Sequence, residues 1–106
     1  MVPMKTVTHY EPPSPEDLAE LRHALQYDRT AMAALAGVAD GNQWRKYTGG
    51  TAPRRASLHM LFFMAARLEL PPEQLDAVYQ RMRALGCELE FAGELCPQAL
   101  QTENLP

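Results

Sequence analysis

The spacing of apolar and polar residues predicts a first helix over residues 15–26. Leucines recur there at helical intervals: Leu18, Leu21 and Leu25. Ser14 is a favourable N-cap, Pro15 suits the first helical position, and Asp17 stands where the acidic residue of a capping box belongs. Two prolines precede this signal and prevent an earlier helix start, so residues 1–13 are expected to form a flexible N-terminal arm.

Two shorter helices are predicted to follow the first. Asp28 is a potential N-cap for the second helix, and Gly37 is expected to end it because glycine adopts left-handed backbone angles at little cost. This helix is rich in alanine, which allows another helix to pack closely against it at a steep angle. After a turn at residues 40–42, a third helix is predicted over residues 42–48, and two glycines stop it.

A fourth helix is predicted from Pro53 to Glu69, and a fifth over residues 73–85. The fourth has an apolar stripe on one side: Leu58, Leu61, Phe62, Ala65 and Leu68. Its opposite side is apolar as well: Met60, Phe63 and Met64. Such a helix is either central to the core or covered by a second subunit, and the sequence supports both interpretations. The fifth helix is apolar on one face: Leu75, Val78, Tyr79, Met82 and Leu85.

The predicted fold is all-α, a compact bundle of about five short helices in residues 14–86, followed by an acidic C-terminal tail of residues 87–106. Residues 87–91 alternate apolar and acidic side chains, a pattern typical of a strand. They would pair with residues 6–10 in a two-stranded ribbon, but such a ribbon alone is marginally stable. We therefore expect disorder after Gly93.

Length and composition restrict the class of protein. A chain of 106 residues has room for one domain, and 46% hydrophobic with 22% charged residues is the balance of a folded, soluble protein. The longest apolar stretch, residues 60–66, is too short to span a bilayer, and no secretory signal is recognisable. Cys87 and Cys96 are too few for a disulfide scaffold, which favours a reducing, cytoplasmic location.

The sequence shows no constellation typical of catalysis, and we expect neither an enzyme nor a cofactor. Gly49 and Gly50 follow a helix rather than a strand, which is not the arrangement of a phosphate-binding loop. No serine or cysteine has a recognisable catalytic partner. The histidines have no second metal ligand three or four positions further along the chain, so no metal site is predicted.

Charge is distributed unevenly along the chain, whose formal net charge is −3. Residues 41–68 contain no acidic residue and five basic ones: Arg45, Lys46, Arg54, Arg55 and Arg67. The rest of the chain is strongly acidic. Such segregation concentrates positive potential on one part of the surface, although five cations in a window of this length also occur by chance.

The most informative segments are residues 28–38 and 42–50. The first contains a small residue, three further residues, then glycine and a β-branched residue: Ala33, Gly37 and Val38. The second contains Trp44 and Tyr47 with two basic residues between them, followed by glycines. In these features the chain resembles the helix-turn-helix of the lambda-repressor-like (Xre-type) DNA-binding family, in the variant common in small phage-type proteins. The resemblance covers residues 15–85.

Each position of the pattern also has a physical reason. Ala33 is small where the third helix crosses the second, and Gly37 allows the sharp turn whose corner Val38 fills. Trp44 and Tyr47 lie three positions apart, so they share one helix face and are expected to anchor the third helix on the core. The side chains of Gln43, Arg45 and Lys46 are then directed outward.

The resemblance implies a DNA-binding surface on and around the third helix. Its predicted DNA-contacting residues are Arg29, Thr30, Asn42, Gln43, Arg45, Lys46, Thr48, Arg54 and Arg55. Arginine forms two hydrogen bonds to guanine, glutamine pairs with adenine, and arginines near helix starts reach the flanking phosphates. The simpler interpretation is that Trp44 is an ordinary core residue and that Arg45 and Lys46 form a solvated helix face.

One feature departs from the family pattern. Counted from Ala33, Trp44 comes one position later than the family's first anchor, so the turn at residues 39–41 is one residue longer. Asp40 in this turn brings a negative charge close to the place expected for a phosphate. The register of the base contacts therefore depends on how this turn is folded.

The sequence predicts a small cytoplasmic regulator of transcription whose third helix reads the major groove of double-stranded DNA. A homodimer is expected because one short helix contacts few base pairs. The alternative is a protein-interaction module on the same scaffold, such as an adaptor, inhibitor or antirepressor that uses its acidic surface and tail. Carboxylates of the tail favour that alternative: Glu88, Glu90, Glu94 and Glu103. The same tail would also shield the basic face of the free protein.

Overall fold

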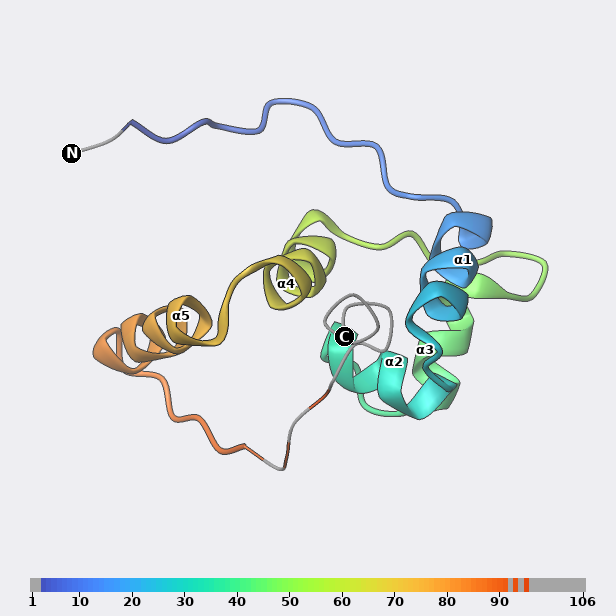
Figure 1. The fold of residues 1–106 in the computed structure, drawn as a ribbon. Coiled ribbons are helices and arrows are strands. Elements are labelled where there is room, and N and C mark those ends of the chain that lie inside the picture. The colour runs from blue at the N-terminus through green and yellow to red at the C-terminus, as the bar shows by residue number, and fades with distance from the viewer. Residues whose placement is uncertain (1–2, 92, 94, 96–106) are drawn as a thin grey trace, which may run out of the picture.

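The computed structural model describes residues 3–91, 93 and 95 of the chain, and its helices confirm the all-α prediction (Figure 1). Five helices follow one another in these residues: α1 (Pro15–Leu25), α2 (Arg29–Ala36), α3 (Gly41–Thr48), α4 (Leu58–Glu69) and α5 (Pro72–Ala84). The described residues form no strand, so residues 87–91 do not pair with the arm. Most of the acidic tail lies outside the described residues, and so does most of the segment expected to be disordered. None of the helices in the described ranges is long and apolar enough to cross a membrane.

Side-chain caps fix where the first three helices begin. Ser14 and Asp17 form the predicted capping box, in which each side chain accepts the other residue's backbone N–H at 3.0 Å. Asp28 and Asp40 cap α2 and α3 in the same way, with their carboxylates accepting backbone N–H groups at 2.8 and 3.0 Å. Gly37 ends α2 with the left-handed φ of 79° that its position requires.

The start of α4 differs from the prediction. The helix begins at Leu58, with Ser57 as its N-cap, and not at Pro53. The segment before it is committed to long-range contacts, because the Arg54 N–H donates to a carbonyl of α3 and the Ala56 carbonyl accepts a hydrogen bond from the arm. In a helix from Pro53 the Ala56 carbonyl would accept the Met60 N–H, but this N–H donates to the Ser57 hydroxyl instead, so the helix starts after Ser57.

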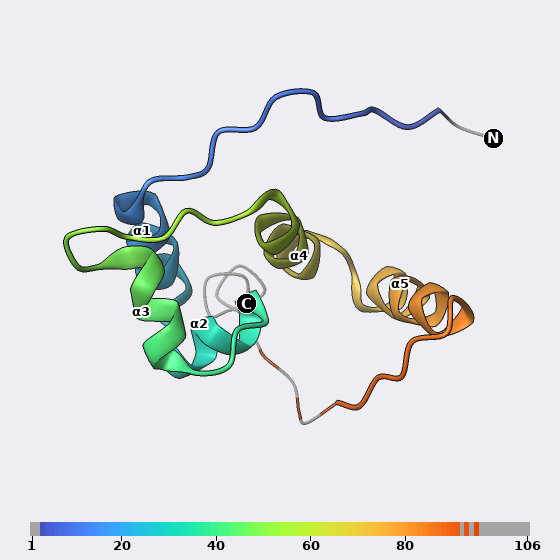
Figure 2. The ribbon, with the colours of Figure 1, turned by 180° about the vertical axis from the view of Figure 1, so that it is seen from behind.

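The core lies between α1, α2, α3 and one face of α4, as the two opposite views show (Figures 1 and 2). Helices α2 and α3 each pack against two others: α2 against α3 and α4, and α3 against α1 and α2. The buried hydrophobic residues are Leu18, Leu25, Tyr27, Met32, Ala33, Leu35, Ala36, Trp44, Ala56 and Met64. Helix α3 is thus fixed by its contacts with α1 and α2.

The core contacts of α4 come from both predicted apolar sides, Met60 and Met64 from one and Leu68 from the other, so the core takes only part of each side. Met64 is buried and Met60 is half-buried against the core, whereas Phe62 is 72% exposed. Arg67 links α4 to α2, because one of its guanidinium nitrogens donates hydrogen bonds to the Ala34 and Leu35 carbonyls at 2.7 and 2.8 Å. Arg67 therefore completes the C-terminal end of α2 and is not part of an open basic surface.

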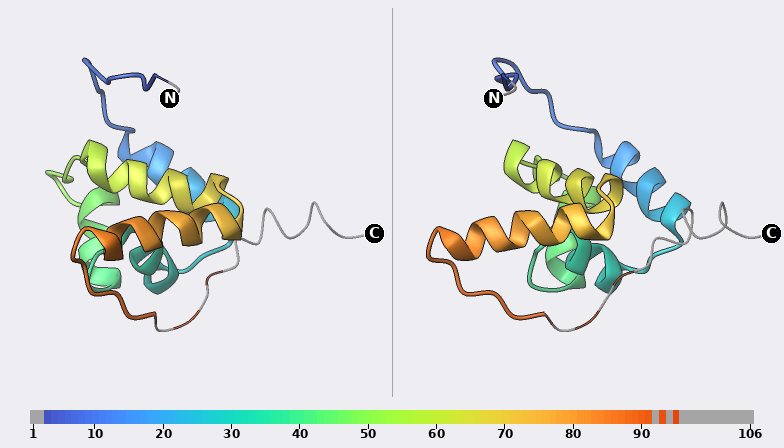
Figure 3. Two further views of the ribbon diagram at one scale, coloured as in Figure 1. Left: turned by 90° about the vertical axis from the view of Figure 1, so that its left-hand side faces the viewer. Right: turned by 60° about the vertical axis from the view of Figure 1, so that its left-hand side comes forward.

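Helices α4 and α5 follow one another through a short turn and run in opposite directions, an arrangement called the α4–α5 hairpin below, but they stand apart rather than packing closely (Figures 1 and 3). No residue of α5, which lies wholly in the described part of the chain, is buried. The segment after α5 folds back against it, since the Tyr79 and Phe91 rings lie 5.0 Å apart and Arg83 donates to the Leu89 carbonyl at 3.2 Å. The hairpin thus leaves much of its apolar surface uncovered.

Candidate nucleic-acid interface

The inward face of α3 carries the two aromatic anchors. Trp44 is 1% exposed and belongs to the core, and Tyr47 is half-buried against it. Their ring centroids lie 6.4 Å apart with the ring planes tilted by 32°. The arrangement agrees with the three-residue spacing seen in the sequence, and it fixes which face of α3 points away from the protein.

The outward face of α3 is polar and basic. Asn42, Arg45 and Lys46 are exposed, while Gln43 and Thr48 are half-buried at its edges. The Lys46 ammonium donates to the Gln43 side-chain carbonyl at 3.5 Å, and the Thr48 hydroxyl donates to the Arg45 backbone carbonyl at 3.4 Å. Within the described ranges no carboxylate forms an ion pair with Arg45 or Lys46. Two cations and two side-chain amides therefore share one accessible helix face.

The longer turn before α3 ends in a cap. The Asp40 carboxylate accepts the Gln43 N–H at 3.0 Å, so the residue that brings negative charge to this place also stabilises the helix start. A phosphate at the N-terminus of α3 would meet this carboxylate. The outward face, with Asn42, Arg45 and Lys46, is therefore more favourable to an anion than the helix end is.

The N-termini of α2 and α3 meet at Gly41. A Cβ at this position would lie 3.0 Å from Arg29 Cβ and 3.5 Å from the Thr30 nitrogen. Gly41, predicted to lie in a turn, is the first residue of α3 and permits this close approach. Arg29 and Thr30, both exposed, are thereby brought beside Asn42 at one end of the face.

The segment before α4 lies at the other end of the face. The Arg54 N–H donates to the Lys46 carbonyl at 2.7 Å, which holds the backbone of Arg54 against the C-terminal turn of α3. Its side chain is exposed. Arg54 and Arg55 were predicted at the start of a helix, and this is wrong because α4 starts at Leu58. The structure nevertheless places Arg54 next to the basic residues of α3.

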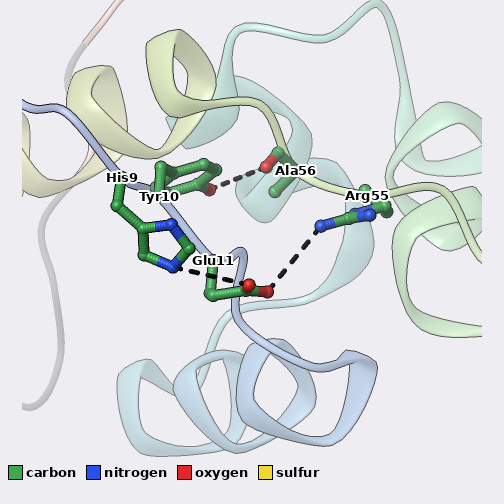
Figure 4. A network of polar contacts seen from close by, with 5 residues as sticks. All are labelled: His9, Tyr10, Glu11, Arg55 and Ala56. Atoms are coloured by element: carbon green, nitrogen blue, oxygen red, sulfur yellow. Dashed lines mark hydrogen bonds and ion pairs between the residues drawn. The ribbon is translucent and has the colours of Figure 1, made fainter.

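Arg55 belongs to a small polar network that joins the arm to this segment (Figure 4). Glu11 lies 3.9 Å from the Arg55 guanidinium and 3.5 Å from the His9 imidazole, and the Tyr10 hydroxyl donates to the Ala56 carbonyl at 2.7 Å. The carboxylate is 73% exposed, so this ion pair stabilises the fold by little. The contacts of Tyr10 and Glu11 were not predicted from the sequence, because no local pattern connects these residues to a segment more than forty positions away.

The remaining pattern residues lie at the turn between α2 and α3. Ala33 is buried, and its carbonyl accepts the Gly37 and Val38 N–H groups at 2.9 and 3.0 Å. A Cβ on Gly37 would lie 3.1 Å from the ring of Phe63 in α4. Glycine is thus required here for two reasons, its positive φ and the close approach of α4. Val38 is half-buried against the core.

Comparisons with protein-family models, with curated proteins and with solved structures found no match for this chain. A proposal for its function therefore rests on the geometry around α3.

Proposed function

We propose that the chain is a helix-turn-helix DNA-binding protein, a homodimeric regulator of transcription that inserts α3 into the major groove. The observation that carries the proposal is the two-sided character of α3. Trp44 is buried and fixes the helix, while Arg45 and Lys46 are exposed on its other side with no carboxylate partner in the described part of the chain. A short helix held in this way is suited to the width of the major groove.

The side chains divide between base and backbone contacts. Arg45 is the best candidate for a bidentate contact with guanine, and Asn42 and Gln43 carry the amide groups that pair with adenine. Arg29 and Arg54, at opposite ends of the face, are placed to contact phosphates on either side of the groove. This division gives α3 the sequence-reading role and its neighbours the positioning role.

The experiment that tests the proposal is a binding-site selection from random double-stranded DNA with the full chain. We expect recovered duplexes to share a short sequence repeated about one helical turn apart. Titrations of a recovered duplex at several salt concentrations should show that the logarithm of the association constant falls linearly with the logarithm of the salt concentration. The slope should be about −0.9 for each phosphate neutralised. Failure to retain any duplex at low salt would reject DNA binding and favour the protein-interaction hypothesis.

A further inference from the structure

We propose that the groove between α4 and α5 is the contact surface for a second copy of this chain, so that two α4–α5 hairpins form a four-helix bundle. The inference rests on the proposed function in one respect: it locates the contact between the two copies that reading two half-sites requires. The other observations concern the residues that line the groove, its size and its position.

Helix α4 presents a second apolar stripe that the core does not use. Leu58, Phe62 and Ala66 follow one another at four-residue spacing and line the groove, while Met60 and Met64 point to the core. Phe62 is 72% exposed, although it is among the largest apolar side chains of the protein. An aromatic residue left in water in the middle of a helix face indicates a surface that another molecule covers.

Helix α5 is less buried than α4. Its apolar face consists of four residues that line the same groove: Leu75, Val78, Tyr79 and Met82. None of its thirteen residues is buried, all of them being described. Three of the four are half-buried, Leu75, Tyr79 and Met82, and Val78 is 44% exposed. A helix of this length is marginal in water by itself, so further burial of this face would stabilise it. A second hairpin provides such burial.

The groove is large and apolar. It holds about 530 Å³ and is bounded by α4, by α5 and by residues 4–7 of the arm. Among the described residues that line it, only Lys5 and His59 are able to carry a charge. A surface without a dominant charge does not select an acidic or basic partner, and an apolar surface is typical of the contact between identical subunits.

The area and shape of the groove match a second copy. Five of its apolar side chains, Met4, Val7, Phe62, Phe63 and Val78, are between 36% and 91% exposed. At about 200 Å² for a large side chain, they expose on the order of 600 Å² per copy. Two copies then cover about 1,200 Å², which reaches the lower end of the range for specific interfaces. Helices α4 and α5 are also similar in length, about 18 and 20 Å, as helices of a symmetric bundle are.

The position of the groove leaves the proposed DNA-binding face free. Helices α3 and α5 lie at opposite sides of the molecule in both views (Figures 1 and 2). A two-fold axis at the α4–α5 hairpin therefore keeps both copies of α3 uncovered. A self-complementary contact of this kind closes at two copies and does not continue into a filament.

Sedimentation equilibrium of the full chain tests the inference. The native chain should sediment as a dimer at micromolar concentration, and Val78→Glu should shift it to a monomer. Gln80→Glu places the same charge on the opposite side of α5, where the side chain is exposed, and should leave the dimer intact. Val78 is 44% exposed, so the variant does not disturb the core, and an unchanged circular dichroism spectrum verifies the fold. A native monomer, or a dimer that Val78→Glu leaves unchanged, overturns the inference.

Cysteine crosslinking provides the positive test. In a background with Cys87→Ser and Cys96→Ser, oxidised Val78→Cys should yield a covalent dimer, and Gln80→Cys should not. Equal crosslinking of both variants overturns the proposed contact. A native chain that is monomeric and binds a hydrophobic dye at the groove shows that a small apolar ligand is the occupant, which also overturns it.

Experiments can refute either of the two proposals without refuting the other. A dimer broken by Val78→Glu that retains no duplex DNA would refute the proposed function and leave the interface standing. A chain that selects a DNA sequence as a monomer would refute the interface and leave DNA binding standing.

Discussion

At the scale of single residues, two carboxylates determine how much positive charge around α3 is available to a phosphate. Asp40 caps the helix with its carboxylate 3.0 Å from the Gln43 nitrogen, and Glu11 lies 3.9 Å from the Arg55 guanidinium. Asp40 is the more important of the two, because its carboxylate both stabilises the start of α3 and would repel a phosphate there. The two effects are separable by substitution.

We expect Asp40→Asn and Asp40→Ala to strengthen binding to any duplex, because both remove a negative charge beside the DNA-binding face. Asparagine caps helices as well as aspartate does, so only Asp40→Ala should lower the free energy of unfolding, by about 1 kcal/mol. DNA titration and urea unfolding measure the two effects. Weaker binding by Asp40→Asn would contradict the proposed orientation of α3 toward DNA.

Arg54→Ala should weaken binding to all duplexes by a similar factor and reduce the salt slope by about one unit, because Arg54 is assigned to a phosphate. The substitution retains the backbone hydrogen bond from residue 54 to the Lys46 carbonyl, so the fold is preserved. Titrations of a selected and an unrelated duplex at several salt concentrations make the comparison. A loss confined to the selected duplex would instead assign Arg54 to a base.

At the scale of the elements, local chemistry accounts for most of the fold. The predicted bounds of α1, α2, α3 and α5 are within about one residue of those observed. Capping side chains mark the starts of α1, α2 and α3, prolines mark the start of α5, and Gly37 ends α2. The start of α4 was not predictable in this way. Pro53 is a good helix-starting residue, but the contacts of Arg54 with α3 and of Ala56 with the arm determine that the helix begins later.

The candidate site also has some features that the sequence predicts and others that it does not. The inward position of Trp44 and Tyr47 follows from helical spacing, and the sequence alone predicts it. The placement of Arg54 beside Lys46 depends on a contact between segments rather than on a pattern within one. The ion pair of Arg55 with Glu11 likewise joins the arm to a distant segment, which local sequence cannot indicate.

Gly37 and Gly50 provide a matched test of the contact between α2 and α4. Both have positive φ, 79° and 84°, but only a Cβ on Gly37 would meet a neighbour, the Phe63 ring at 3.1 Å. Alanine at Gly50 should therefore cost about 1 kcal/mol from backbone strain alone, and alanine at Gly37 about 1 kcal/mol more. Urea unfolding of the two variants measures the difference. Equal losses would mean that α4 does not press against this turn.

At the scale of the whole molecule, the chain consists of a packed unit and an exposed hairpin. The buried residues come from α1, α2, α3, α4 and the segments between them, whereas α5 contributes none in the described structure. The unit that holds α3 is thus complete within one chain. If the α4–α5 hairpin is completed by association, as proposed above, the stability of the chain is linked to its dimerisation.

Thermal unfolding should show this linkage. Because a dimer is stabilised by mass action, the Tm of the native chain should rise with protein concentration. The Tm of Val78→Glu should be lower and independent of concentration, and Gln80→Glu should behave as the native chain does. Calorimetry or circular dichroism over a hundredfold range of concentration provides the measurement. A native Tm that does not change with concentration would contradict the linkage.

The central claim is that the outward face of α3 reads DNA, and the most direct measurement is a titration of a selected duplex with Arg45→Ala and Arg81→Ala. Both variants lose one exposed arginine, but Arg81 lies on α5, far from α3. The account predicts that Arg45→Ala binds about 5- to 150-fold more weakly, corresponding to about 1–3 kcal/mol, and that Arg81→Ala binds nearly as the native chain does. Equal affinities for the two variants would contradict the account.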